Sequence, residues 1–472
     1  MKRITIDPVT WIEGHAKITI HLDETGAVTG TQFHVTQVRG FEKFVEGRPY
    51  YEMPGITARI CGICPISHLM AAAKACDAVM AVRIPPAATM IRELIHCAQF
   101  VQSHALSFFH LSAPDLLLGF DSDPARRNVL GLAEKRPELA RNGIDLRKFG
   151  QRIIEGVAGE RVHPSGIVPG GVNRPLDPKV RAEILTGLGP ARQIAQKTLD
   201  LYKNIVDQFN DEIASFGSMD TLYAGLVDEG GGLQLYDGWM RFRDPNGSII
   251  ADHLDASRYS DYIGEATLRD SYLKAPYFKP KGYPGGIYRV GPLARLNSAD
   301  HLGTPAANAE FNEYRQRFGV VVASSFHYHY ARLIEIIFAL ERIGALLDSS
   351  QILDPHVRAH AGVNALEGIG IAEAPRGILI HHYKVDEQGA MKWANLIIAT
   401  GHNNLAINRS IEQVSKRYVR GDKLQEGMLN RVSAVVRAFD PCLSCSTHAG
   451  GLVPLRIELV DAAGKVLDEL RS

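Results

Sequence analysis

Four of the six cysteines form two Cys-x-x-Cys pairs, Cys61 with Cys64 and Cys442 with Cys445, which lie near opposite ends of the chain. A Cys-x-x-Cys turn lets two thiolates converge on one ion, and two such turns supply four soft ligands. Such a metal would join the two ends of the chain. Pro65 follows the first pair and suits the first turn of a helix, whose amide groups would stabilise thiolates.

The spacing of the cysteines alone leaves alternatives open. A structural zinc site, or two unrelated pairs of core cysteines, would give the same pattern. A thioredoxin-like redox pair is disfavoured, because neither pair lies in a βαβ pattern. Cys76 and Cys97 lie on apolar helical stretches and are interpreted as core thiols. The pair His381 and His382 has no second metal ligand at helical spacing, so we interpret both as core or network histidines.

The elements that must position these residues follow from the hydrophobic pattern. Alternation over residues 17–35 predicts a β-hairpin, and the Ala-rich stretch after Pro65 predicts a helix. We therefore expect an α+β fold with a predominantly helical core and β-hairpin regions near both ends. The other expected elements are a long helix ending before Pro114, helices over 178–215 and 305–349, irregular α+β structure over 218–300, paired strands over 376–400 and a hairpin over 452–470.

Composition excludes several classes of protein. The 472 residues contain 52 Lys and Arg and 52 Asp and Glu, and this zero net charge argues against nucleic acid as the main partner. Six cysteines are too few for a disulfide scaffold. The longest apolar run, residues 333–347, is interrupted by charges, so we expect no membrane span. The N-terminus lacks the apolar stretch of a signal peptide, which favours a cytoplasmic protein.

Longer motifs surround both cysteine pairs, and together they resemble those of the large, catalytic subunit of nickel–iron hydrogenases. The similarity is greatest to the cytoplasmic, bidirectional, NAD-linked group, and it extends over nearly the whole chain. It implies the large-subunit fold of that family. The motifs are IDPVTWIEGH at 6–15, RGFEKF at 39–44, RICGICPISH at 59–68, SHALSFFHLSAPD at 103–115, EAPRG at 373–377 and DPCLSCSTH at 440–448.

The resemblance implies a role for each cysteine. All four would bind nickel, with Cys61 and Cys442 as terminal ligands. Cys64 and Cys445 would bridge nickel and an iron that carries carbon monoxide and cyanide. Glu13 matches the glutamate that transfers protons beside a terminal cysteine.

Further site residues follow from the same motifs. Arg376 matches the arginine above the open metal position, and Pro375 would shape the cyanide pocket. Asp115 and Asp440 match acidic residues that orient this arginine and the site. Thr400 lies where a hydroxyl donor to a cyanide is expected. The family usually has Arg where this chain has Trp11, a departure that we expect to alter packing more than chemistry.

The resemblance also implies a second metal site and a contact with a partner. Glu42 and His448, with a backbone carbonyl near Ile398, would bind magnesium. His68 would face the nearest iron–sulfur cluster of a small subunit.

The C-terminal segment matches a removable extension. In the family, a maturation protease cuts after the histidine of the last motif once metallochaperones have delivered the metals, and the matching cut lies between His448 and Ala449. We therefore expect residues 1–448 to form one catalytic domain and residues 449–472 to be removed. Within the domain we expect a β-rich part over 1–60, a mainly helical part over 65–350 and a β-rich return to the metal site over 376–448.

The expected reaction is the reversible, heterolytic cleavage of H₂ into protons and electrons. Electrons would pass through the iron–sulfur clusters of the small subunit to diaphorase subunits that bind flavin and NAD. This chain has no G-x-G-x-x-G after a strand, and its only plausible metal-binding cysteines are the four in the two pairs, so we expect neither NAD nor an iron–sulfur cluster in it. The alternatives are the same chemistry with NADP or a deazaflavin as acceptor, a metal-free relative from a proton-pumping complex, or a zinc-stabilised binding protein.

Overall fold

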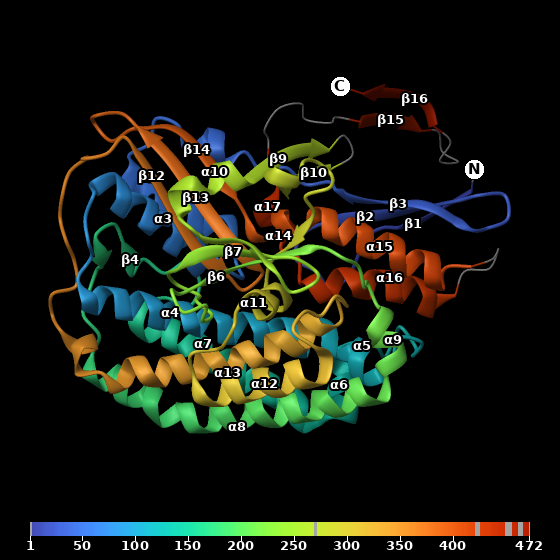
Figure 1. Ribbon diagram of the computed structural model, residues 1–472, viewed down its shortest axis with the longest axis horizontal. Helices are drawn as coiled ribbons and strands as arrows, with labels where there is room; N and C mark the ends of the chain where they lie inside the picture. The colour runs from blue at the N-terminus through green and yellow to red at the C-terminus, as the bar shows by residue number, and fades with distance from the viewer. Residues whose placement is uncertain (1, 269–270, 421–424, 449–455, 461–465, 472) are drawn as a thin grey trace.

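The protein combines several small sheets with a layer of long helices (Figure 1). This arrangement is the α+β class that the sequence predicts. The computed structural model describes residues 2–268, 271–420, 425–448, 456–460 and 466–471.

The N-terminal segment is a three-stranded antiparallel sheet, which confirms the predicted hairpin and adds one strand. β2 (Ala16–Leu22) lies between β1 (Lys2–Ile6) and β3 (Val28–Val35). Ile18 and Ile20 on β2 are fully buried, as alternation requires for a sheet with one covered face. The strands end at β3, and short helices lead to the first cysteine pair: α1 (Phe41–Phe44), η1 (Tyr50–Glu52), α2 (Met53–Thr57) and η2 (Ala58–Ile60).

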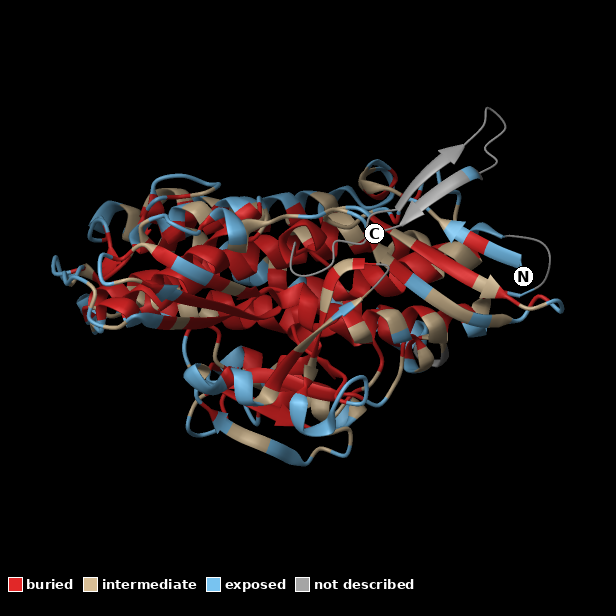
Figure 2. Ribbon diagram, turned by 90° about the horizontal axis from the view of Figure 1, so that it is seen from above, coloured by how far each residue is buried: buried red, intermediate tan, exposed pale blue. Residues whose placement is uncertain are grey.

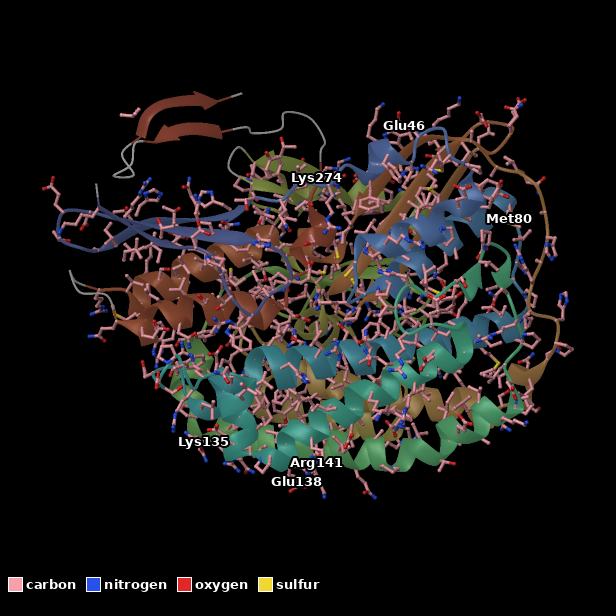
Figure 3. All side chains as sticks on the ribbon, turned by 180° about the vertical axis from the view of Figure 1, so that it is seen from behind. Glu46, Met80, Lys135, Glu138, Arg141 and Lys274 are labelled. Carbon is pink, nitrogen blue, oxygen red and sulfur yellow. The ribbon has the colours of Figure 1, made fainter. Side chains whose placement is uncertain are left out.

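Long helices form the lower layer in Figure 1, where α4, α7, α8 and α13 pack against one another. Lys135, Glu138 and Arg141, labelled in Figure 3, project from the outer face of this layer. The bounds are α3 (Pro65–Met80), α4 (Pro86–Ala105), the π-helical η3 (Leu106–Ser112), α5 (Ala113–Leu118), α6 (Val129–Lys135), α7 (Pro137–Ala158), α8 (Pro178–Gln208), α9 (Asn210–Ser215), α12 (Pro305–Phe318), α13 (His327–Asp348) and η6 (Ser350–Leu353).

Three predicted helices differ from the structure. The helix expected over 178–215 is divided at Phe209 into α8 and α9. The helix expected over 305–349 is two helices, because Gly319, with φ of 93°, ends α12 and a loop precedes α13. The helix expected to end before Pro114 continues through η3 into α5. Pro114 lies in the first turn of α5, where its missing N–H costs no hydrogen bond.

The middle of the chain builds a mixed sheet of order β11-β6-β7-β8, in which only the β11–β6 pair is parallel. This region agrees with the irregular α+β structure expected over 218–300. Its elements, with the small β4–β5 pair that precedes them, are β4 (Ile167–Val168), β5 (Gly171–Val172), β6 (Leu222–Val227), β7 (Trp239–Arg243), β8 (Ile249–Leu254), η4 (Ala256–Arg258), α10 (Tyr259–Tyr262), β9 (Ile263–Leu268), β10 (Ser271–Phe278), η5 (Lys279–Lys281), β11 (Tyr288–Arg289) and α11 (Pro292–Ser298).

A third sheet supports the helix that follows the first cysteine pair. β13 (Gly377–Val385) pairs with β12 (Glu367–Ala374) and β14 (Met391–Ile397), and α3 packs across β12. The approach is backbone to backbone, because a Cβ added at Gly370 would lie 2.0 Å from the carbonyl oxygen of Ala71. Only glycine permits this contact.

The C-terminal part corrects one expectation. Only the beginning of 376–448 forms strands, and the return to the cysteines is helical: α14 (Ala399–His402), α15 (Asn404–Tyr418), α16 (Glu426–Phe439) and α17 (Leu443–Ser446). The predicted terminal hairpin is present as β15 (Arg456–Val460) paired with β16 (Val466–Arg471). The predicted cut next to Ala449 lies outside the described residues.

Buried residues run through the centre of the molecule, in helices and in strands (Figure 2). α13 is buried along nearly its whole length. Even so, no helix among the described residues combines the length and apolar character needed to cross a membrane.

Candidate metal centre

The four paired cysteines meet in one buried cluster whose sulfur atoms all lie within 4.8 Å of one another. Cys61 follows η2, Cys64 directly precedes α3, and Cys442 and Cys445 lie at the start and in the middle of the last short helix, α17. The Sγ–Sγ distances are 3.3 Å for Cys61–Cys442, 3.0 Å for Cys61–Cys64, 2.8 Å for Cys442–Cys445 and 4.0 Å for Cys64–Cys445. No other group of three or more clustered His, Cys, Asp or Glu ligands occurs among the described residues.

Backbone amides orient the cluster. The amides of Ile63 and Cys64 donate to Cys61 Sγ at 3.2 and 3.1 Å, as expected for a turn that opens a helix. The amide of Cys442 donates to Thr400 Oγ1 at 2.9 Å, which ties α17 to the start of α14. Thr400 thus lies beside the cysteines, but its hydroxyl accepts a bond in this arrangement.

The sulfur atoms are too close to carry four uncompensated negative charges. Hydrogen bonds from Cys442, Cys445 and Cys61 hold the pKa of Cys64 well below its usual value. Burial raises the pKa of Cys442 and of Cys445 well above theirs. A cation is therefore needed to keep all four as thiolates, and four soft donors at these distances fit a transition metal such as nickel.

Glu13 reaches the cluster from the N-terminal segment. Its carboxylate Oε2 accepts hydrogen bonds from Cys442 Sγ at 3.1 Å and from the Ser444 amide at 3.0 Å. Its backbone carbonyl accepts from the Leu443 amide. Gly14, with φ of 91°, allows this approach, because a Cβ there would lie 2.8 Å from Leu443 Cβ. The half-buried carboxylate of Glu13 can therefore exchange a proton with the Cys442 sulfur.

Trp11 lies in the same loop and adopts a φ of 64°, a region that bulky residues rarely occupy. Arg437 braces the loop, because its Nε donates to the Thr10 carbonyl at 3.0 Å. The residue that departs from the usual motif thus lies at a strained position two residues before Glu13.

Arg376 lines the same cavity and is 3% exposed. Its Nε donates to the Asp440 carbonyl at 2.5 Å, its Nη2 to Asp440 Oδ1 at 3.0 Å and its Nη1 to Ser103 Oγ at 3.3 Å. Burial opposes its charge, but Asp440 and the nearby thiolates outweigh burial and raise the pKa. Pro375 is buried and lies between two residues that line the cavity, Ala374 and Arg376. The other lining residues are Cys64, His68, Leu379, Ile398, Ala399, Thr400, Cys442 and Cys445.

Asp115 does not orient Arg376 directly as the resemblance implied, because its carboxylate pairs with other residues. Arg437 Nη1 donates to its carboxylate, Asn430 Nδ2 donates at 3.0 Å, and Arg127 Nε lies 3.3 Å away. Asp115 stands on α5, beyond η3, and its bonds hold α16 against α5.

His68 is fully buried beside Cys64. Its expected orientation toward a partner's iron–sulfur cluster stays a prediction. Its Nδ1 is hydrogen-bonded to His381 Nε2 at 3.2 Å, and His381 Nδ1 to the Tyr383 hydroxyl at 2.6 Å. Within the part of the chain that the structure describes, His68 Nε2 has no hydrogen-bond partner. His381 is the network histidine that the sequence indicated.

The predicted magnesium ligands come together only in part. His448 Nδ1 contacts Glu42 Oε1 directly. The pKa of Glu42 is lowered overall. Burial by itself would raise this pKa, but the hydrogen bond and the charge of His448 outweigh burial. The charge of Lys274, labelled in Figure 3, also lowers it. Ile398 instead lines the cysteine cavity, and its carbonyl accepts the Gly401 amide.

Sequence reasoning missed a buried ionic network next to Arg376. Arg295, Glu335 and Glu373 are each fully buried, and Arg295 is bonded to both carboxylates. Glu373 lies in the quoted EAPRG motif, but no spacing rule connects it to Arg295 on α11 or to Glu335 on α13. Only the presence of charged residues in otherwise apolar helices could have drawn attention to them.

Comparison with known proteins places these features in context. A family model described as nickel-dependent hydrogenase matches residues 39–123 and 241–448. A second model, described as HoxL-like, matches residues 3–38.

Two curated relatives are similar over most of their length. The chain is 39% identical to the NAD-reducing hydrogenase HoxS subunit beta of Cupriavidus necator, covering 99% of each protein. It is 42% identical to a protein of the vhu F420-non-reducing hydrogenase of Methanocaldococcus jannaschii, covering 88% of this chain and 99% of the relative. Among solved structures, an NAD⁺-reducing [NiFe]-hydrogenase in the H₂-reduced state superposes with a TM-score of 0.93 at 44% identity, covering 95% of this chain and all of the other.

Proposed function

Because the chain belongs to the nickel-dependent hydrogenase family as a large subunit, we propose that it is the catalytic subunit of a bidirectional, NAD⁺-reducing hydrogenase. Its reaction is the reversible, heterolytic conversion of H₂ into two protons and two electrons. The observation that carries this proposal is the buried cluster of four cysteine sulfurs, with Glu13 and Arg376 directed at it.

In this proposal all four cysteines would hold nickel, and Cys64 and Cys445 would also hold an iron. When bound, a centre of this kind with carbon monoxide and cyanide ligands would supply the redox and Lewis-acid chemistry for the unequal splitting of H₂. Arg376 presents its guanidinium to the cavity, where it can donate to a cyanide or polarise H₂. Apolar Leu379, Ala374 and Ala399 help to exclude water from the cavity.

Glu13 serves as the proton acceptor in this proposal. Oε2 is 3.1 Å from Cys442 Sγ, within reach of a proton on that sulfur. The carboxylate is half-buried, so it connects the sulfur with the exterior. General bases placed in this way contribute typically about 10²- to 10⁴-fold to rate.

Electron transfer requires a partner. Besides the four clustered cysteines, the chain has only Cys76 and Cys97. Both are buried core thiols whose pKa is raised by burial, as the sequence indicated, so neither can hold an iron–sulfur cluster. A small subunit would supply clusters, and diaphorase subunits with flavin would reduce NAD⁺, which would place the complex in the cytoplasm.

Magnesium and maturation complete the proposal. Glu42 and His448 would bind magnesium, and the contact between them brings residues of RGFEKF and of the last motif together. Ile398 is a weaker candidate, because its carbonyl already accepts a bond. Metallochaperones would load the centre, and a protease would then cut after His448.

A second candidate function differs from the first in the molecule that accepts the electrons. Relatives named F420-non-reducing hydrogenases are as similar as the NAD-reducing one, at 42% against 39% identity. The same H₂ chemistry coupled to an acceptor other than NAD⁺ is therefore the second candidate.

Infrared spectroscopy of the purified, processed complex tests the centre. We expect cyanide and carbonyl stretches together with stoichiometric nickel and iron. Zinc without nickel or iron, or spectra without these bands, would refute the assignment. H₂-dependent reduction of NAD⁺ by the same complex, compared with NADP⁺ and a deazaflavin, identifies the acceptor.

A further inference from the structure

Arg295, on α11, is fully buried. All five N–H groups of its guanidinium donate hydrogen bonds. The Nε and Nη2 groups donate to both carboxylate oxygens of Glu335, at 2.6 and 2.7 Å. Nη1 donates to Glu373 Oε2 at 2.7 Å. A guanidinium satisfied in this way has one permitted orientation, because its fork is planar and rigid.

The two remaining donors hold the backbone immediately before Arg376. Nη1 donates to the Ala374 carbonyl at 2.9 Å, and Nη2 to the Pro375 carbonyl at 3.1 Å. The backbone at Gly291, just before α11, also lies close to Arg376, because a Cβ added at Gly291 would lie 2.8 Å from the Arg376 carbonyl oxygen. The segment that ends in Arg376 is thus fixed by its backbone on the α11 side.

Each carboxylate of the network has a second anchor. Glu335 Oε2 is hydrogen-bonded to His104 Nε2 at 2.8 Å. Glu373 Oε1 accepts the Leu226 amide at 3.0 Å. The ring of Phe100 lies 5.2 Å from the Arg295 guanidinium carbon, so an aromatic ring also faces the cation. The network therefore joins α4, α11, α13, β6 and β12 around one point.

We infer that Arg295 is a positioning residue: it fixes the Ala374–Pro375 backbone and thereby aims the Arg376 guanidinium at the cysteine cavity. The inference rests on the proposed function, because Arg376 acts at the metal centre only in that proposal. Lysine cannot replace Arg295, since one ammonium group cannot reach Glu335, Glu373 and two carbonyl oxygens in the same plane.

The test is a double-mutant cycle between Arg295→Lys and Arg376→Lys in the complete complex, with nickel content, infrared bands and H₂ turnover measured for each variant. We expect Arg295→Lys to lower kcat about 10- to 100-fold, since small misplacements of a reacting group cost that much. It should also shift the cyanide bands in the same direction as Arg376→Lys. The double variant should be within about twofold of Arg376→Lys alone, because residues that act through one another do not add.

Arg92→Lys is the matched control. Arg92 is also fully buried, is paired with Asp77 at 2.6 Å and donates to the carbonyls of Gly171 and Val168 at 3.0 and 2.7 Å, but it does not line the cysteine cavity. We expect the cyanide bands to stay at their wild-type positions in Arg92→Lys.

Other outcomes overturn the inference. Multiplicative losses in the double variant would assign Arg295 a general structural role, and unmoved cyanide bands in Arg295→Lys would do the same while leaving the proposed function intact. Absence of these bands from the wild-type complex would overturn the proposed function and the inference with it. If Arg295→Lys does not fold, a variant that combines Arg295→Gln with Glu335→Gln and Glu373→Gln removes the cation together with both carboxylates that it pairs with, and it must show the same band shift.

Discussion

Glu13 shows how much chemistry one residue gains from its position. A glutamate in the loop between two strands is ordinarily a solvated carboxylate. Here Oε2 accepts hydrogen bonds from the Cys442 sulfur and the Ser444 amide, while the side chain is only half-buried and so remains partly exposed. The same carboxylate thus contacts a metal-site thiol and the exterior.

Glu13→Gln is therefore expected to lower H₂ turnover about 100-fold or more, because the amide keeps the shape of the side chain but cannot accept a proton. Nickel content and the infrared bands of the complex should stay as in the wild type. The control is Glu24→Gln in the exposed turn between β2 and β3. Turnover of Glu13→Gln within about twofold of wild type would remove Glu13 from the proton path, since a general base contributes far more than that.

At the scale of elements, α3 and η3 set the geometry of the site. α3 carries His68 and begins directly after Cys64, and it lies on β12 with its backbone in contact at Gly370. η3 is π-helical and joins α4, whose Ser103 accepts a bond from Arg376, to α5, which carries Asp115. A π-helical turn next to such groups is a common feature of functional sites.

Gly370→Ala tests the contact between α3 and β12. The added methyl would meet the Ala71 carbonyl at 2.0 Å and the Ala75 amide at 2.6 Å, so α3 must move. Overpacking of this kind costs about 1–3 kcal/mol. We expect a lower urea midpoint and, because α3 carries the Cys64 end of the cluster, reduced nickel content.

The matched control for this change is Gly30→Ala on β3, where an added Cβ meets nothing within 4 Å. We expect its urea midpoint and nickel content to equal those of the wild type. Wild-type stability and nickel content in Gly370→Ala would show that the helix can shift without disturbing the cluster.

At the scale of the whole molecule, the site exists only when distant segments meet. Glu13 forms a β-bridge with Cys442, and Glu42 contacts His448. The proposed metal ligands thus come from both ends of the chain, and the helical layer between them supplies Arg376 with its Ser103 partner. Metal binding would consequently stabilise the entire fold, since the unfolded chain presents no such site.

Buried histidines should make the fold sensitive to acid. Burial lowers the pKa of His96, His104 and His327 to about 4 and that of His402 to about 3, from an ordinary 6.5. The unfolded chain therefore binds more protons below pH 6.5, so stability is full above that pH and falls as the pH drops toward 4. When fully expressed, the loss of stability is about 3 kcal/mol for each of His96, His104 and His327 and about 5 kcal/mol for His402, and the sum is of the order of a typical total stability.

Urea unfolding followed by circular dichroism between about pH 7.5 and 4.5 checks this expectation. The midpoint should fall steeply below an ordinary histidine pKa of about 6.5. His327→Phe, whose ring would remain among Tyr314 and Phe318, should make the fall shallower, whereas His356→Gln at an exposed position should not. A urea midpoint that stays constant down to about pH 5 would contradict the lowered pKa values of the buried histidines.

The linear sequence specifies the donor types and the turns that hold them, because two cysteines three residues apart converge through local backbone geometry alone. It likewise specifies the hairpin at 17–35 and the helix after Pro65, since their hydrophobic periods are local. Tertiary packing alone decides which side chains complete the site. Arg295 meets Glu335 and Glu373 across three elements, Asp115 turns to Arg437 instead of Arg376, and His68 faces inward to His381. Such partners depend on how elements pack around a shared core, which no residue spacing along the chain encodes.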